Sequence, residues 1–156
     1  MDHIATFYWH PKATSVINQR ALRPGGCLSI KVLLADDSEV MRRIIAKLLS
    51  EEPSTSLVGE AKGFAETIQL ANELRPDVLV MDLHMSDERQ YSPESVRFQL
   101  SMHSGCIVAI SVWNDEQAKA LAKRFGARVL LDKVNLYSEL IPAIKFNCPP
   151  GAASGI

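Results

Sequence analysis

The sequence contains no long apolar run. Its longest uninterrupted apolar stretches, residues 78–81 and 106–110, are about one strand long, whereas a helix needs roughly 20 apolar residues to cross a bilayer. Residues 1–29 also lack the basic start and the following stretch of about 7 to 15 apolar residues that mark a secretory signal. The sequence therefore predicts neither a membrane partner nor export.

An excess of basic charge is also absent. Lys and Arg number 17 and Asp and Glu number 18, so the formal net charge is −1. Proteins that bind nucleic acid usually carry a clear positive charge. The residues that follow Ile144 are moreover too few to form a helix-turn-helix domain. We therefore expect no nucleic-acid partner and an output that passes through another protein.

Cysteine is scarce and is not arranged in a recognisable pattern. Cys27, Cys106 and Cys148 form an odd, widely spaced set without a C-x-x-C motif. Cys106 lies inside an apolar run, where a thiol would simply be buried. From this usage we infer a reducing environment, the cytoplasm.

The composition that remains is that of a folded α/β domain. The chain has 156 residues, of which 47% are hydrophobic and 22% are charged, as in an average globular protein with one core. Strand-like apolar runs alternate with helical patterns, which predicts a parallel sheet with helices on both faces. The five predicted strands are residues 30–35, 57–61, 78–81, 106–110 and 128–131.

Capping signals mark where the helices begin. Ser38 and Ser92 are expected N-caps, the second followed by a proline in the first turn. Asn114 begins a predicted capping box, and the last helix is expected to start at Ser138 because Pro142 then lies in its first turn. The domain should span residues 30–147, between a poorly ordered extension (1–29) and a C-terminal tail (148–156).

Polar residues stand at the ends of the predicted strands, where parallel sheets bind ligands. Strand one ends in Asp36 and Asp37, strand three in Asp82 and strand four in Ser111, and Lys133 follows strand five. Three carboxylates and one ammonium sum to −3 + 1 = −2, a cluster that needs a counter-ion. Oxygen ligands with room for water suit Mg²⁺, so this set of residues predicts phosphoryl chemistry on a carboxylate.

These residues occur in a set of motifs that resembles the receiver domains of response regulators in two-component signalling, of the single-domain type. The resemblance covers residues 30–146. It implies a flavodoxin-like (βα)5 fold, a doubly wound α/β sheet with strand order 2-1-3-4-5. The motifs are VLLADDS (32–38), VMDLHM (80–85), IS (110–111) and DK (132–133).

The resemblance also implies roles for these residues. Asp82 would accept a phosphoryl group from a sensor histidine kinase or a phosphotransfer protein. Its Mg²⁺ would be held by Asp36, Asp37, Asp82 and the backbone carbonyl of His84. Ser111 and Lys133 would bind the phosphoryl oxygens, and the phosphorylated domain would signal through a downstream target protein. Such a domain is not a dedicated enzyme, and whether it hydrolyses its own acyl phosphate is left open.

The chain departs from the family pattern in three places. Ser86 replaces the usual proline and residues 87–90 replace a glycine-containing turn, so we expect a mobile loop beside Asp82. Val134 replaces the usual proline after Lys133, which predicts a trans peptide and a less rigid lysine. Leu130 replaces the usual aromatic switch residue, so the familiar rotation of a ring cannot carry the signal.

Other functions fit the sequence less well. A receiver fold used only as a scaffold, without phosphorylation, remains the alternative, although all the polar site residues are present. A phosphohydrolase of the haloacid dehalogenase type would need a carboxylate at position 84, where the chain has His84. The glycine motifs of dinucleotide-binding and P-loop proteins do not occur. Trp113, two positions after Ser111, and His84 are expected to control the access of water to the acyl phosphate.

Overall fold

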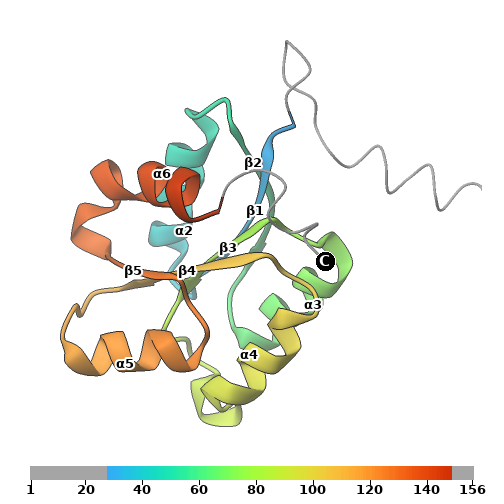
Figure 1. Ribbon diagram of the computed structural model, residues 1–156, viewed down its shortest axis with the longest axis vertical. Coiled ribbons are helices and arrows are strands. Elements are labelled where there is room, and N and C mark those ends of the chain that lie inside the picture. Colours follow the sequence, from blue (N-terminus) through green and yellow to red (C-terminus); the bar gives the residue numbers. More distant parts are fainter. Residues whose placement is uncertain (1–27, 149–156) are drawn as a thin grey trace, which may run out of the picture.

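The computed structural model describes residues 28–148, so the predictions for residues 1–27 and 149–156 lie outside the part described. Within it, no helix is long and apolar enough to cross a membrane. The strands and helices alternate along the chain (Figure 1) in the order β1 (Ile30–Ala35), α2 (Glu39–Ser50), β2 (Thr55–Ala61), α3 (Phe64–Leu74), β3 (Val78–Asp82), the 3-10 turn η1 (Glu88–Gln90), α4 (Pro93–Ser101), β4 (Cys106–Ser111), α5 (Glu116–Arg124), β5 (Val129–Asp132), the 3-10 turn η2 (Lys133–Asn135) and α6 (Leu136–Asn147).

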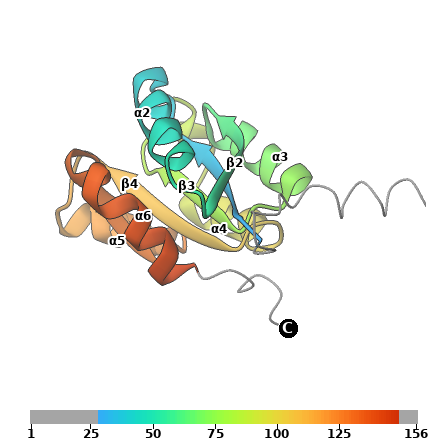
Figure 2. The ribbon, with the colours of Figure 1, turned by 90° about the horizontal axis from the view of Figure 1, so that it is seen from above.

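The strands form one parallel sheet in the order β2-β1-β3-β4-β5, which confirms the predicted flavodoxin-like topology. Helices α2 and α6 cover one face and α3, α4 and α5 cover the other (Figures 1 and 2). Successive residues of the central strand β3 point to opposite faces: Val80 packs in the α2–α6 core and Met81 in the other. Because β1, β3 and β4 are buried on both faces, their polar residues are confined to the strand ends.

Two of the four predicted helix starts are confirmed and two are displaced. The hydroxyl of Ser38 accepts a hydrogen bond from the backbone N–H of Met41, and Ser92 caps α4 in the same way. For α5, however, the prediction of Asn114 is wrong, because the carboxylate of Asp115 accepts the N–H of Ala118 at 2.8 Å. Asn and Asp are about equally good N-caps, so two of them in succession leave the start ambiguous by one residue.

The last helix begins earlier than predicted. It starts at Leu136, directly after η2, and Pro142 lies in its interior instead of its first turn. Leu136 is buried in the core beside Leu140, and this burial favours the two extra residues of helix. Pro142 is exposed, so the carbonyl that it leaves without an intrahelical donor, that of Ser138, lies on a turn from which water is not excluded.

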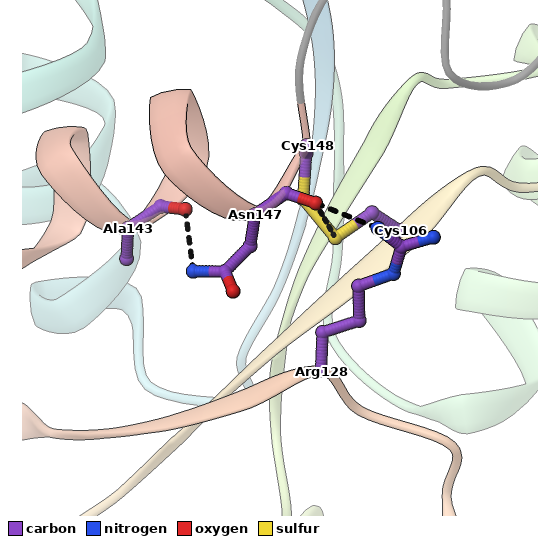
Figure 3. Close-up of a disulfide and its surroundings, with 5 residues drawn as sticks. All are labelled: Cys106, Arg128, Ala143, Asn147 and Cys148. Carbon is purple, nitrogen blue, oxygen red and sulfur yellow. Dashed lines mark hydrogen bonds between the residues drawn. A yellow bond between two sulfur atoms is a disulfide. The ribbon is translucent and has the colours of Figure 1, made fainter.

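A disulfide joins the first residue of β4 to the C-terminal end of α6. Cys106 and Cys148 are bonded across 42 positions of sequence, with their Cα atoms 5.8 Å apart (Figure 3). The Arg128 guanidinium donates to the carbonyl oxygen of Asn147 at 2.8 Å beside this bond. Cys106 is buried as expected, but its pairing was not predicted. The cysteines therefore give no support to the reducing environment that we inferred from them.

Breaking this disulfide should lower the free energy of unfolding by about 4 kcal/mol, because the bond closes a long loop in the unfolded chain. The change is Cys148→Ser, measured by urea denaturation, with the parent protein in reductant as the control, whose stability should equal that of the variant. Intact mass without reductant should show the oxidised protein lighter by two hydrogens than the reduced one. Equal stability of Cys148→Ser and the oxidised parent would contradict the prediction.

Candidate functional site

Three carboxylates meet at the carboxyl edge of the sheet. Asp82 is the last residue of β3, and Asp36 and Asp37 directly follow β1, which pairs with β3 in parallel up to Ala35 and Met81. Parallel pairing brings these strand ends to one edge. One oxygen from each of the three side chains lies within 4.8 Å of the others, so the predicted acidic cluster is present.

Burial differs sharply among the three acids. Asp36 has no exposed surface and Asp82 is 5% exposed, whereas Asp37 is exposed. Backbone N–H groups hold one oxygen of each buried acid: Ser38 donates to Asp36 Oδ1 at 2.8 Å, and His84 donates to Asp82 Oδ1 at 3.2 Å. Each of these carboxylates therefore has a fixed orientation and a second oxygen that points elsewhere.

Lys133 takes up those second oxygens. Its Nζ atom lies 2.7 Å from Asp36 Oδ2 and 3.0 Å from Asp82 Oδ2. It begins η2, whose N-cap Asp132 accepts the N–H of Val134 at 2.9 Å. The peptide bond to Val134 is trans, as predicted. Two buried carboxylates contact the ammonium group in this loop without a proline, and the less rigid lysine that we expected stays a prediction.

The pKa values of the central pair move in the same direction for different reasons. Burial raises the pKa of Asp82, and the negative charge of Asp36 adds to this effect, while Lys133 opposes it. Burial by itself would lower the pKa of Lys133, but its contacts with Asp36 and Asp82 outweigh burial and raise that pKa. The raised pKa of Lys133 keeps its ammonium group charged at neutral pH, whereas burial opposes the ionisation of Asp82.

The cluster has the properties of a site for a hard divalent cation. Asp36 Oδ2 is buried and accepts no hydrogen bond of acceptable geometry, despite its short ion-pair contact with Lys133. An oxygen in this state keeps lone pairs for another cation. Carboxylate oxygens with an exposed member, Asp37, on the solvent side suit Mg²⁺, which keeps several of its waters. The residues present thus fit the predicted ion.

Ser111 lies on the next strand. The β3–β4 register pairs Asp82 with Ile110, which places Ser111 one residue beyond the level of Asp82. It is almost fully buried, at 1% exposed. Its hydroxyl oxygen accepts the N–H of Trp113 at 3.1 Å, so its own proton is available to a ligand.

Two rings, which we call the rim of the site, each follow a site residue by two positions along the chain: His84 follows Asp82 and Trp113 follows Ser111. The ring centroids of His84 and Trp113 are 5.6 Å apart in a T-shaped arrangement, and both rings line a hollow of about 400 Å³ bounded on its other side by α5. His84 Nδ1 also lies 2.9 Å from Glu88 Oε2. The predicted partnership of His84 and Trp113 is therefore a direct contact in the structure.

Comparison with known proteins identifies this arrangement. The family model of the response regulator receiver domain matches residues 32–145. The chain belongs to this family. Its receiver domain contains all the matched strands and helices, and the carboxylate cluster lies within it.

Similar proteins include parts of larger regulators. A protein-glutamate methylesterase/protein-glutamine glutaminase of Anaeromyxobacter dehalogenans is 33% identical over 74% of this chain, and the response regulator protein VraR of Staphylococcus saprophyticus is 31% identical over 76% of it. The match spans 33% of the first protein and 56% of the second. This chain therefore corresponds to only part of these relatives.

Solved structures agree on the fold. The response regulator domain of Thermotoga maritima CheB has a TM-score of 0.66 at 25% identity, with 76% of this chain and 95% of that chain covered. The signal receiver domain of NarL from Mycobacterium tuberculosis has a TM-score of 0.69 at 22% identity, with 78% and 98% covered. The second likeness supports the fold alone.

The sequence analysis missed a buried arginine behind the receiver domain's acidic site. Arg42 on α2 donates from Nη1 to the carbonyl oxygen of Asp36 at 2.8 Å, and its Nε lies 3.6 Å from Glu60 Oε1. The signal was present: Arg42 stands three residues before the buried Ile45, so it falls on the buried face of α2. It fixes the backbone at the start of the Asp36–Asp37 pair.

The raised pKa of Asp82 predicts a stability cost. The folded protein binds this proton more tightly than the unfolded chain, so the free energy of unfolding falls as the pH rises from the ordinary value of 3.8 through the raised one. In Mg²⁺-free buffer at pH 7, Asp82→Asn should stabilise the protein by about 1 kcal/mol. The gain should vanish in acid below the ordinary value.

Thermal melts across this pH range test the prediction. Asp37→Asn is the matched control: its carboxylate is exposed, so a smaller gain is expected. A variant Asp82→Asn that is no more stable than the parent at pH 7 would contradict the assignment of the cost to burial of Asp82.

Proposed function

We propose that the chain is a phosphoacceptor receiver, in which Asp82 takes a phosphoryl group from a phosphohistidine of a sensor histidine kinase or a phosphotransfer protein. The observation that carries the proposal is the pair of buried carboxylates, Asp36 and Asp82, bridged by Lys133. A domain that served only as a scaffold would gain stability from apolar residues at these positions. Their retention favours chemistry over the scaffold alternative.

The proposed transfer is a displacement at phosphorus. A carboxylate oxygen of Asp82 attacks the phosphorus atom, the P–N bond of the phosphohistidine breaks as the P–O bond forms, and the imidazole leaves and takes up a proton. Lys133 stays beside the new acyl phosphate and neutralises part of its charge, and the hydroxyl of Ser111 donates to one of its oxygens. Bound Mg²⁺ would supply further positive charge at the phosphoryl oxygens.

The residues that would hold Mg²⁺ are Asp36, Asp37, Asp82 and the backbone carbonyl of His84. The first three bring oxygens together in the structure. The role of the carbonyl rests on the family pattern. In the ion's presence Lys133 needs to balance fewer negative charges, so the site is arranged to bind the cation and the phosphoryl group together.

Apolar side chains around the site support docking of a partner protein there. Val40, Val112, Trp113 and Val134 are each more than half exposed, and each lies within three residues of a site residue along the chain. A histidine that donates a phosphoryl group has to approach Asp82 closely, and exposed apolar residues beside a functional group are typical of transient interfaces.

We propose a cytoplasmic domain with a protein donor and a downstream target protein, and no nucleic-acid or membrane partner.

Phosphorylation should depend on Asp82 and on Mg²⁺. Treatment with acetyl phosphate and Mg²⁺ should add one phosphoryl group to the intact mass, and the addition should be lost in Asp82→Asn and prevented by chelation of Mg²⁺. Asp77→Asn is a control variant, since Asp77 lies at the opposite end of β3 and accepts the N–H of Lys31. Unchanged labelling of Asp82→Asn would remove the proposal and leave the scaffold alternative.

The lifetime of the phosphoprotein should depend on Trp113. A bulky ring beside the phosphorus hinders attack by water, so Trp113→Ala should shorten the half-life measured by the loss of the added mass. In a Trp9→Phe background, where Trp113 is the remaining tryptophan, Mg²⁺ with beryllofluoride should change the emission. Binding without an emission change, together with an unchanged half-life in Trp113→Ala, would show that Trp113 has no part in the mechanism.

A further inference from the structure

Helix α3 lacks a capping side chain of its own. Its N-cap is Gly63, which makes no side-chain hydrogen bond. Asp87, more than 20 residues later in the loop after β3, supplies the missing acceptor: Oδ1 accepts the N–H of Phe64 at 2.9 Å and Oδ2 accepts the N–H of Ala65 at 3.1 Å. A carboxylate at a helix N-terminus is favourable both as an acceptor and as a negative charge.

Gly63 makes room for this carboxylate. A Cβ atom at position 63 would lie 2.9 Å from both carboxylate oxygens of Asp87, so any larger residue there would require the Asp87 side chain to shift. The backbone of Gly63 is extended, with φ −165°, a conformation open to every residue. The glycine is therefore required by the approach of Asp87 and not by its own backbone.

The loop that carries Asp87 is anchored elsewhere as well. Leu83 and Met85 are buried in the core, Met85 accepts the N–H of Glu88 at 3.0 Å, and the ring of Tyr91 packs near Phe64 with 6.2 Å between centroids. These contacts hold the loop although the proline and glycine of the family pattern are missing; the mobility that we expected from their absence stays a prediction.

A line of contacts runs from Asp87 to the rim of the acidic site. The neighbouring Glu88 begins η1, and its Oε2 atom lies 2.9 Å from His84 Nδ1. The ring of His84 in turn packs edge-on against Trp113. Fixing Asp87 on α3 thus fixes η1, the Glu88 carboxylate that orients His84, and the His84–Trp113 ring pair.

We propose that Asp87 is a positioning residue, which holds the His84–Trp113 ring pair in place by anchoring its loop to the N-terminus of α3, and so sets the lifetime of the acyl phosphate. This inference rests on the proposed function for its effect on lifetime. Its geometric part, the placement of Trp113, does not require phosphorylation.

The first experiment measures decay of the phosphoprotein. Asp87→Asn keeps the size of the side chain but can accept only one of the two N–H groups, and it should shorten the half-life about threefold or more. Gly63→Ala should act in the same direction, because it displaces the carboxylate from the other side of the contact. Thr67→Val is the matched control: it removes the buried hydrogen bond from Thr67 to the Gly63 carbonyl, weakens the same helical turn and should leave the half-life unchanged.

A double-variant cycle separates positioning from simple loss of stability. If Asp87 acts through the ring pair, Asp87→Asn should add nothing to the decay rate of Trp113→Ala. Multiplication of the two effects would overturn the proposal, as would an unchanged half-life in Asp87→Asn. All variants are compared at a temperature at which each is fully folded by circular dichroism.

The second experiment uses the unphosphorylated protein. In the Trp9→Phe background, Asp87→Asn should increase quenching of Trp113 fluorescence by acrylamide, because the ring loses its fixed neighbour, and Thr67→Val should not. Increased quenching in a protein that acetyl phosphate does not label would show that the proposed function is wrong while Asp87 still positions the rim. Unchanged quenching overturns the inference, whatever the result of labelling.

Discussion

The ion pair between Lys133 and the two buried aspartates is the interaction on which the rest of the site depends. Asp36 and Asp82 are carried to the same place by the parallel pairing of β1 and β3, and neither could be buried there as a lone anion at acceptable cost. Lys133 comes from the far side of β4, at the end of β5. The order of the strands thus allows one cation, Lys133, to neutralise two anions that are 46 positions apart in the sequence.

The same ion pair explains why the site lowers the stability of the fold: it buries charged groups where apolar residues could pack. The strands beneath it are buried on both faces, and the charged residues at their ends are explained by the proposed function rather than by packing. Arg42 and the Ser38 N–H hold Asp36 from behind, and His84 holds Asp82. These hydrogen bonds keep one oxygen of each carboxylate free to face Lys133, although apolar residues at the same positions would pack better.

Much of this could be predicted because its signals are local. The alternation of apolar runs gave the sheet, and strand ends marked Asp36, Asp82, Ser111 and Lys133, since topology brings such residues to one edge whatever the details of packing. Errors arose where two neighbouring residues offer the same chemistry, as with Asn114 and Asp115, or where burial of Leu136 outweighs a proline signal. The family itself was identified from motifs and agrees with the comparison.

Other features could not be read from the sequence because they depend on residues that meet only in the fold. The pairing of Cys106 with Cys148 requires the end of α6 to lie at the start of β4. The cap on α3 requires a loop from beyond β3 to reach back to Gly63. The local sequence of one partner contains no signal for the other. Polar residues in place of the usual proline and glycine predict a mobile loop as long as the contact of Asp87 with the N-terminus of α3 is unknown.

The meeting of Gly63 and Asp87 has a consequence for how this chain can vary. The two positions constrain each other: a larger residue at position 63 would displace the carboxylate of Asp87, and loss of this acid would leave the backbone N–H groups of Phe64 and Ala65 without their acceptor at a helix whose N-cap residue makes no side-chain hydrogen bond. The two positions should therefore change together. A serine or aspartate at position 63 would cap α3 with its own side chain, and position 87 would no longer need an acid. Descendants of this sequence should therefore fall into two classes, and mixtures of the two should be rare.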